Sequence, residues 1–212
     1  MDEKGISKQY KTESLGGIIT NLIYVIKEES PELSDKNVKK EAKRRFVARV
    51  DSSFMCARNA DVVTFLRNKA FDNELHHMTR TYLYTYKEEW LGFSTISIKI
   101  LDISKLEKLV KKKLIASSKS PDNMNEMPAY LLAQVAKNDI CALKGFCAND
   151  ILTHALQEID NARALVGGKI VVLDSINVTK VIKKYELVGF VKFGEVFNAP
   201  NELQPMFLDL SK

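Results

Sequence analysis

The feature that most constrains the fold is a strand–helix–strand unit in the C-terminal half of the chain. Apolar residues at helical spacing predict an amphipathic helix over residues 150–165, and Gly167-Gly168 ends it. A strand over residues 129–136 precedes this helix, and the continuous apolar run KIVVLD (residues 169–174) predicts a buried strand after it. Because a helical crossover of this length joins parallel neighbours, both strands are expected in one sheet, side by side and parallel.

The remaining strands are predicted to be antiparallel. The runs TRTYLYTY (residues 79–86) and WLGFSTISIKIL (residues 90–101) flank a polar turn, which indicates a hairpin. A short strand is expected over residues 50–56, and two last strands over residues 190–196 and 205–210. The fold class is therefore α/β (α+β), with one mixed, mostly antiparallel sheet flanked by helices.

Residues 1–49 are predicted to be a helical N-terminal extension, and residues 50–212 a single domain. Helical spacing of apolar residues indicates two helices between residues 15 and 48, separated at Ser30-Pro31. Their apolar faces need cover, so the helices either dock on the domain or form a homodimer contact. The second helix has a basic face, which is either solvated or a footprint for nucleic acid: Lys36, Lys39, Lys40, Lys43, Arg44, Arg45 and Arg49.

Composition narrows the functional classes. The three cysteines are odd in number and form no CxxC pair, and the histidines have no zinc-ligand spacing, so neither a disulfide framework nor a metal site is expected. No apolar stretch is long enough to cross a membrane, and the first residues have no signal-like apolar region, which favours a cytoplasmic protein. The net charge of +5 is compatible with a nucleic-acid partner.

Two stretches could carry chemistry. The junction KGFCANDIL (residues 144–152) opens a helix, whose unpaired N–H groups can hold a phosphate; an ordinary capped helix is the alternative. Cys147 at this junction could instead be a nucleophile with a lowered pKa, although no histidine partner is nearby in the sequence. Tyr185 precedes Gly189-Phe190 and can direct its hydroxyl at the sheet; the alternative is a core tyrosine with a satisfied hydroxyl.

Taken together, these stretches resemble the GNAT acetyltransferases, most closely those of bacterial toxin type and their phage or plasmid relatives. The resemblance covers roughly residues 50–210. It rests on the order of a strand, a pyrophosphate loop, a long helix, Gly-Gly, the VVLD strand and Tyr-x-x-x-Gly-Phe. Lys144 matches the Arg or Gln of the family's loop, and Cys147 and Asn149 stand where the family has its two signature glycines.

The resemblance implies a site for acetyl-coenzyme A and a role for each matching residue. The pyrophosphate would lie against the loop, and the backbone of Val135 and Lys137 would pair with the pantetheine arm. Tyr185 would be the general acid that protonates the departing thiolate. Glu126 is a candidate base only by its nearness in the sequence. The loop residues implied are Lys144, Gly145, Phe146, Cys147, Ala148, Asn149 and Asp150.

The implied function is an N-acetyltransferase that moves an acetyl group from acetyl-coenzyme A to a primary amine. The acceptor could be a small molecule, a protein or an aminoacyl-tRNA, and the sequence does not choose among them. Because both signature glycines are replaced, the alternative is a degenerate GNAT fold that acts as a non-catalytic module and binds protein or nucleic acid.

Overall fold

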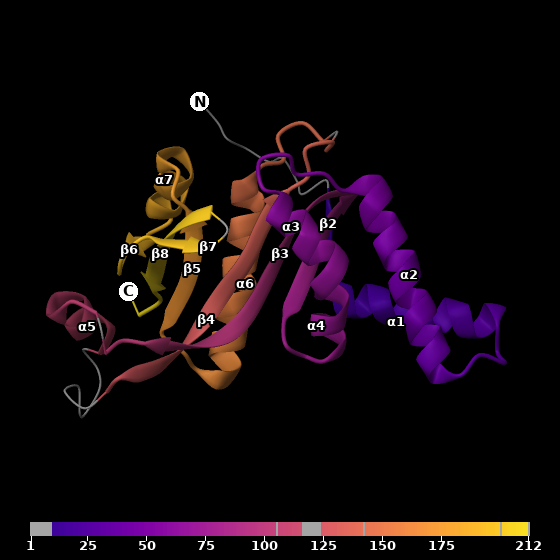
Figure 1. Ribbon diagram of the computed structural model, residues 1–212, viewed down its shortest axis with the longest axis horizontal. Helices are drawn as coiled ribbons and strands as arrows, with labels where there is room; N and C mark the ends of the chain where they lie inside the picture. The colour runs from indigo at the N-terminus through magenta and orange to yellow at the C-terminus, as the bar shows by residue number, and fades with distance from the viewer. Residues whose placement is uncertain (1–9, 105, 116–123, 142, 200, 212) are drawn as a thin grey trace. The chain divides into compact units, whose positions relative to one another are not determined.

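The computed structural model describes residues 10–104, 106–115, 124–141, 143–199 and 201–211 (Figure 1). Contacts divide the chain into two compact units. As far as they are described, the first unit is Met1–Thr95 with Gln134–Ala155, and the second is Ile96–Ala133 with Leu156–Lys212. This division does not coincide with the boundary expected between residues 49 and 50, because the first two helices share a core with residues that follow them.

The elements follow the predicted order in the C-terminal half, except that the strand expected over residues 190–196 covers only Val191–Lys192 and a short additional strand covers Phe197–Ala199. They differ more in the N-terminal half. The strands are β1 (Lys11–Ser14), β2 (Arg80–Tyr86), β3 (Glu89–Asp102), β4 (Glu126–Lys137), β5 (Ile170–Ile176), β6 (Val191–Lys192), β7 (Phe197–Ala199) and β8 (Asn201–Asp209). The helices are α1 (Leu15–Glu29), α2 (Asp35–Ser53), α3 (Ala60–Phe65), a π-helical turn η1 (Leu66–Ala70), α4 (Phe71–Leu75), α5 (Lys108–Ile115), α6 (Ala148–Val166) and α7 (Thr179–Leu187).

The sheet is mixed and mostly antiparallel, as the sequence predicted. Its strand order is β1-β2-β3-β4-β5-β8-β6, with β7 paired to β8. The expected crossover is confirmed, since β4 and β5 pair in parallel with Tyr130 opposite Val171 and Leu131 opposite Val172. Strand β1 pairs antiparallel with β2, and β8 pairs antiparallel with β5, β6 and β7.

The core of the first unit joins the N-terminal helices to β2 and β3. Val38, Ala42, Phe46 and Val50 recur every four residues along α2 and are all buried in this core. The same core includes side chains of α1, of α3 to α4, and of β2 and β3, among them Leu83, Trp90 and Phe93. The apolar faces of α1 and α2 are therefore covered within the unit. The strand expected over residues 50–56 is wrong, because the four-residue spacing continues and α2 runs on to Ser53.

Gly92 on β3 allows two other elements of the first unit to approach closely. A Cβ atom at this position would lie 2.5 Å from Cδ1 of Ile151 and 2.6 Å from the carbonyl oxygen of Ala136. No real Cβ tolerates such distances to backbone, so only glycine fits here. The start of α6 and the end of β4 are thus packed directly against β3.

The core of the second unit lies between the strands β4, β5 and β8 and the segment around α5. It includes Ile103, Ile115, Ile170, Val172 and Phe207, all of them buried. Helix α5 is rich in lysine and was not among the elements expected from the sequence. Arg163 near the end of α6 donates from Nη1 to the carbonyl oxygen of Leu210 at 2.6 Å, which ties this helix to the chain after β8.

Candidate functional site

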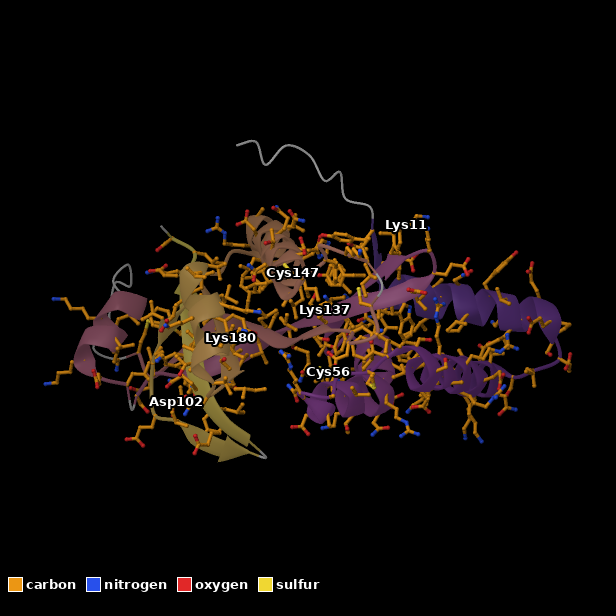
Figure 2. The ribbon with its side chains drawn as sticks, turned by 90° about the horizontal axis from the view of Figure 1, so that it is seen from above. Lys11, Cys56, Asp102, Lys137, Cys147 and Lys180 are labelled. Carbon is orange, nitrogen blue, oxygen red and sulfur yellow. The ribbon has the colours of Figure 1, made fainter. Side chains whose placement is uncertain are left out.

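The candidate cofactor loop begins where β4 ends and runs to the start of α6. Val135 is half-buried and packs against a small aromatic cluster, and Lys137 is the last residue of β4. Figure 2 labels Lys137 and, at the other end of the loop, Cys147. Both belong to the first unit. The loop residues implied by the resemblance are therefore brought together in one compact unit.

The first two residues after β4 are held to β3 and to the chain between α2 and α3. The backbone N–H of Asn138 donates to the carbonyl of Leu91 at 2.8 Å, and that of Asp139 donates to the carbonyl of Met55 at 2.8 Å. The Asp139 carboxylate accepts the N–H of Ala57 at 2.7 Å. The loop therefore starts from a fixed point. Neither residue was predicted from the sequence, although an Asn-Asp pair directly after a strand is a visible polar signal.

Phe146 anchors the far end of the loop. Its buried ring lies 5.0 Å from that of Tyr10 and 6.0 Å from that of Tyr84, centroid to centroid. Gly145 just before it has a φ of +87°, a conformation that favours glycine, and a Cβ there would have no neighbour within 4 Å. Lys144 is exposed. The loop thus offers open space, a glycine and a cation next to an aromatic anchor.

The start of α6 is capped by one of its own side chains. The backbone N–H of Cys147 donates to Oδ2 of Asp150 at 2.7 Å, the back-bonding half of a capping box. Ala148 begins the helix, and Asn149 is exposed in its first turn. This contact matches the ordinary capped helix that was the alternative for this junction, and it places a carboxylate at the start of α6.

A buried polar cluster beside the loop was not found from the sequence. The hydroxyl oxygen of Tyr84 lies 3.0 Å from Oγ of Ser94, 3.2 Å from the carbonyl oxygen of Ile151 and 3.1 Å from Nδ1 of His154. The ring of His154 also meets that of Tyr82 edge-on at 5.3 Å. These contacts link β2 and β3 to the first turns of α6. His154 therefore has a local partner.

Tyr185 belongs to the second unit, where it lies in the last turn of α7. Its carbonyl accepts the N–H groups of Val188 and Phe190, each at 3.1 Å, and Gly189 donates to the carbonyl of Glu186 at 3.0 Å. Gly189 has a φ of +97°. This is a Schellman motif, in which a glycine in the left-handed region terminates the helix. The Tyr-x-x-x-Gly-Phe spacing is thereby explained as a helix-ending signal.

The hydroxyl of Tyr185 is kept protonated by its surroundings. The side chain is half-buried, and burial raises the pKa of Tyr185 to about 12. Desolvation disfavours the phenolate, so the hydroxyl keeps its proton throughout the neutral range. It is therefore a proton donor at neutral pH.

Much of the basic face of α2 is neutralised by carboxylates. Lys43 forms an ion pair with Asp72 at 2.5 Å. Arg44 and Arg45 both bind Glu41, at 2.6 and 3.0 Å. These ion pairs lower the pKa of the Glu41 carboxyl to about 2. The exposed lysines at the start of the helix are Lys36, Lys39 and Lys40.

The other candidate residues are dispersed. Cys56 and Cys141 are half-buried, and Cys147 is exposed. Glu126 is the exposed first residue of β4. Among the described residues, no group of His, Cys, Asp and Glu side chains could hold a metal ion. No described helix is both long and apolar enough to cross a membrane.

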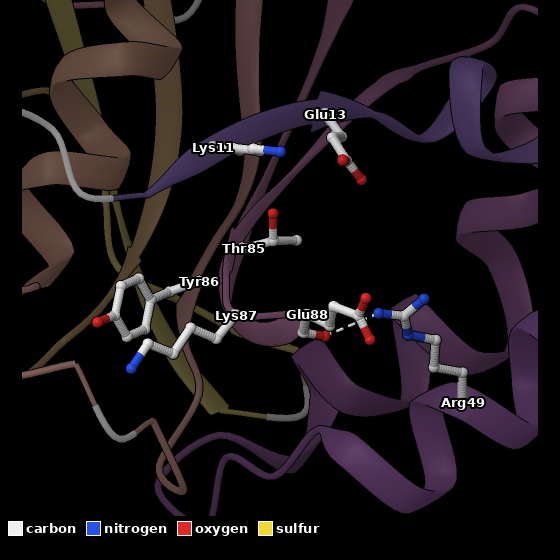
Figure 3. Close-up of a pocket in the computed structure, with 7 residues that line it drawn as sticks. All are labelled: Lys11, Glu13, Arg49, Thr85, Tyr86, Lys87 and Glu88. Carbon is white, nitrogen blue, oxygen red and sulfur yellow. Dashed lines mark hydrogen bonds between the residues drawn. The ribbon is translucent and has the colours of Figure 1, made fainter.

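A polar pocket of about 640 Å³ lies elsewhere in the first unit, between β1, the β2–β3 turn and the end of α2 (Figure 3). None of the residues predicted for the acetyl-coenzyme A site lines this pocket. Arg49 donates from Nη2 to the carbonyl of Glu88 at 2.8 Å and stacks over Trp90 at 4.9 Å. Lys87 and Glu88 both have positive φ, of 47° and 68°. Arg49 therefore stabilises a turn in which two residues other than glycine have positive φ.

Solved structures with the same fold include several toxins. A phenylalanine-for-tyrosine mutant of the AtaT toxin matches with a TM-score of 0.59 and 16% identity, over 99% of this chain and 94% of that chain. A mutant of KacT with the same kind of substitution matches with a TM-score of 0.57 and 17% identity, over 74% of this chain and 86% of that chain.

AtaT complexed with acetyl-methionyl-tRNAfMet matches with a TM-score of 0.54 and 20% identity, over 74% of this chain and 85% of that chain. No protein-family model and no curated protein matches the sequence. The chain shares the fold of these structures, as the GNAT resemblance predicted.

Proposed function

We propose that the chain is an N-acetyltransferase that moves the acetyl group of acetyl-coenzyme A to a primary amine. The observation that carries the proposal is the parallel β4–loop–α6–β5 crossover with its glycine-containing loop, followed by Tyr185 at the end of α7. The shared fold supports it, since one similar structure is AtaTR bound with AcCoA. Acetyl-coenzyme A would supply an activated acetyl thioester.

The loop residues fit a pyrophosphate in several respects. Gly145 leaves open space beside the backbone, and the exposed Lys144 contributes a positive charge. Helix α6 is 19 residues long, and its dipole places a partial positive charge at the N-terminus, beside the loop. The backbone of Val135 and Lys137 would hold the pantetheine arm, and Phe146, Cys147, Ala148, Asn149 and Asp150 would frame the phosphates.

Tyr185 would supply the proton that the leaving thiolate needs. Its hydroxyl is protonated at neutral pH because burial raises the pKa of Tyr185 to about 12. A thiol in water has a pKa of about 8.5. Proton transfer from the buried Tyr185 hydroxyl to a thiolate in water would therefore be uphill by about 5 kcal/mol. Burial of the thiolate in the same site raises its pKa as well, which narrows this gap.

For the acceptor we propose an aminoacyl-tRNA among the three classes that the sequence left open. The support is that AtaT is described in complex with acetyl-methionyl-tRNAfMet. In this chain the exposed lysines Lys36, Lys39 and Lys40 stand on one face at the start of α2. Basic side chains of this kind contact phosphates, and each such contact steepens the salt dependence of binding by roughly one unit of slope.

Calorimetry with acetyl-coenzyme A tests the proposal, followed by transfer of labelled acetyl groups to bulk charged tRNA and to free amines. We expect heat of binding, a rise in melting temperature and acetylated aminoacyl-tRNA. No heat and no thermal shift at millimolar ligand would exclude the enzyme. Acetylation of free amines alone would keep the reaction and remove the tRNA acceptor.

A second candidate is a non-catalytic module, favoured by the hydrogen bond from the Cys147 N–H to the Asp150 carboxylate. This bond occupies a donor that the loop would offer to a phosphate, and it adds a negative charge there. The variants Asp150→Asn and Asn149→Gly separate the candidates. If the wild type ignores coenzyme A and either variant binds it, the loop is degenerate; if the wild type binds coenzyme A and transfers the acetyl group, the non-catalytic module is excluded.

A further inference from the structure

Asn138 uses the whole hydrogen-bonding capacity of its side chain. The residue is 1% exposed. Its Nδ2 donates to the carbonyl oxygens of Ser53 and Trp90, each at 2.6 Å. Its Oδ1 accepts the N–H groups of Met55 at 3.0 Å and Ile140 at 3.3 Å. A carboxamide has two N–H donors and one oxygen with two lone pairs, so this one is saturated.

These partners come from three separate stretches of the chain. Ser53 and Met55 flank the end of α2, Trp90 lies near the start of β3, and Ile140 belongs to the candidate cofactor loop. Every partner atom is a backbone atom. One buried side chain thus fixes backbone positions in a helix end, a strand and the loop at once, which packing by an apolar residue cannot do.

Asn138 also lies at the junction between the end of β4 and the candidate cofactor loop. It directly follows Lys137, whose backbone would pair with the pantetheine arm, and it precedes the loop that would hold the pyrophosphate. The other end of the loop is fixed separately by the buried ring of Phe146. Asn138 touches none of Lys144 to Asp150 in any described hydrogen bond, so its effect on a ligand there would pass through the backbone of the loop.

We infer that Asn138 is a positioning residue that holds the cofactor loop and links it to residues 54–59, the connector between α2 and α3. This inference rests on the proposed function. The second contact of the same kind is made by Asp139, whose backbone and carboxylate bind Met55 and Ala57. The loop and the connector therefore order or open together, and coenzyme binding at the loop stabilises the connector.

Hydrogen exchange on the full-length chain tests this link, with coenzyme A as the probe ligand. Asn138→Ala is compared with Asp139→Ala, which changes an exposed residue and leaves no buried group unpaired in its own side chain. The matched control is Thr81→Val, which breaks the buried Thr81–Thr95 hydroxyl pair (3.0 Å) between β2 and β3. Amide exchange is followed over residues 53–59 and 138–147, and the coenzyme A Kd is measured for each variant.

We expect Asn138→Ala to speed exchange in both segments together and to weaken coenzyme binding by roughly 10- to 100-fold, the scale of a small misplacement of binding groups. Asp139→Ala should show a smaller effect with the same pattern, and Thr81→Val none. Coenzyme A should slow exchange in the connector of the wild type but not of Asn138→Ala.

Two failures are distinguishable. If the wild type binds coenzyme A and Asn138→Ala binds it equally well, or if the two segments change independently, the positioning role is overturned and the proposed function stands. If the wild type does not bind coenzyme A at all, the proposed function and this inference fall together.

Discussion

The ring of Tyr185 meets the ring of Phe190 edge-on, with centroids 5.7 Å apart and planes at 71°. The two residues are also joined through the backbone, since the N–H of Phe190 donates to the carbonyl of Tyr185 at 3.1 Å. This is the hydrophobic contact that accompanies a Schellman motif. The direction of the tyrosine hydroxyl is therefore set by the way α7 ends.

Tyr185→Phe tests whether the hydroxyl takes part in chemistry. The substitution keeps the ring contact with Phe190 and removes only the O–H group. We expect an unchanged coenzyme A Kd by calorimetry and a fall in turnover of about 10²–10⁴-fold, the usual contribution of a positioned general acid. Full turnover on any identified amine would mean that Tyr185 is a packing residue and that another group protonates the thiolate.

Gly189→Ala tests the helix-ending motif. At a φ of +97° an added Cβ is strained, and it would also lie 3.1 Å from Cδ1 of Leu208. We expect a loss of about 1–2 kcal/mol in the free energy of unfolding, measured by urea titration. Gly194→Ala is the control, because that glycine has a φ of +66° and no atom within 4 Å of the new Cβ. Equal losses in the two variants would contradict a role for the Leu208 contact.

The raised pKa of Tyr185 predicts a loss of stability at alkaline pH. Below pH 10 the hydroxyl is protonated in the folded and the unfolded chain alike. Between pH 10 and about 12 the unfolded chain ionises first, so stability falls as pH rises through this window. By pH 11 the loss from this residue is about 1 kcal/mol.

Urea titrations at pH 9 and pH 11 measure this effect. Other tyrosines with raised pKa, such as Tyr10 and Tyr130, shift stability in the same direction, so the wild type is compared with Tyr185→Phe. The variant should lose about 1 kcal/mol less between the two pH values. Identical losses would show that the hydroxyl is not desolvated.

Gly92→Ala tests the close approach of three elements in the first unit. A methyl group would collide with Ile151 and with the backbone oxygen of Ala136, at 2.5 and 2.6 Å. We expect a loss of about 1–3 kcal/mol, typical of overpacking. Adding Ile151→Val should restore little, because the backbone clash remains. Complete rescue by the second substitution would mean that the side chain alone sets the spacing.

The crossover from β4 through α6 to β5 could be predicted because each of its parts has a strong local signal. The helix is amphipathic over several turns, glycines end it, and a parallel buried strand is apolar along its whole length. These signals are independent of the rest of the chain. The same holds for the β2–β3 hairpin, where β-branched and aromatic residues flank a polar turn.

The N-terminal half was harder to predict than the C-terminal half, and the physical reason differs from segment to segment. Strand β1 is mostly exposed and joins the sheet through its backbone, so its side chains carry no alternation. Val50 favours a strand by intrinsic propensity, but its burial four residues after Phe46 keeps it in α2. Asn138 and Tyr84 act through long-range hydrogen bonds, which no local pattern reports.

The first unit is built from two stretches that lie far apart in the sequence, since Gln134–Ala155 completes what Met1–Thr95 begins. During synthesis, the partners of Asn138 in the α2 end and in β3 leave the ribosome long before Asn138 itself. A nascent chain that ends before residue 134 would expose unpaired backbone groups and an unfilled core. We therefore expect the N-terminal half to depend on chaperones until the cofactor loop has emerged.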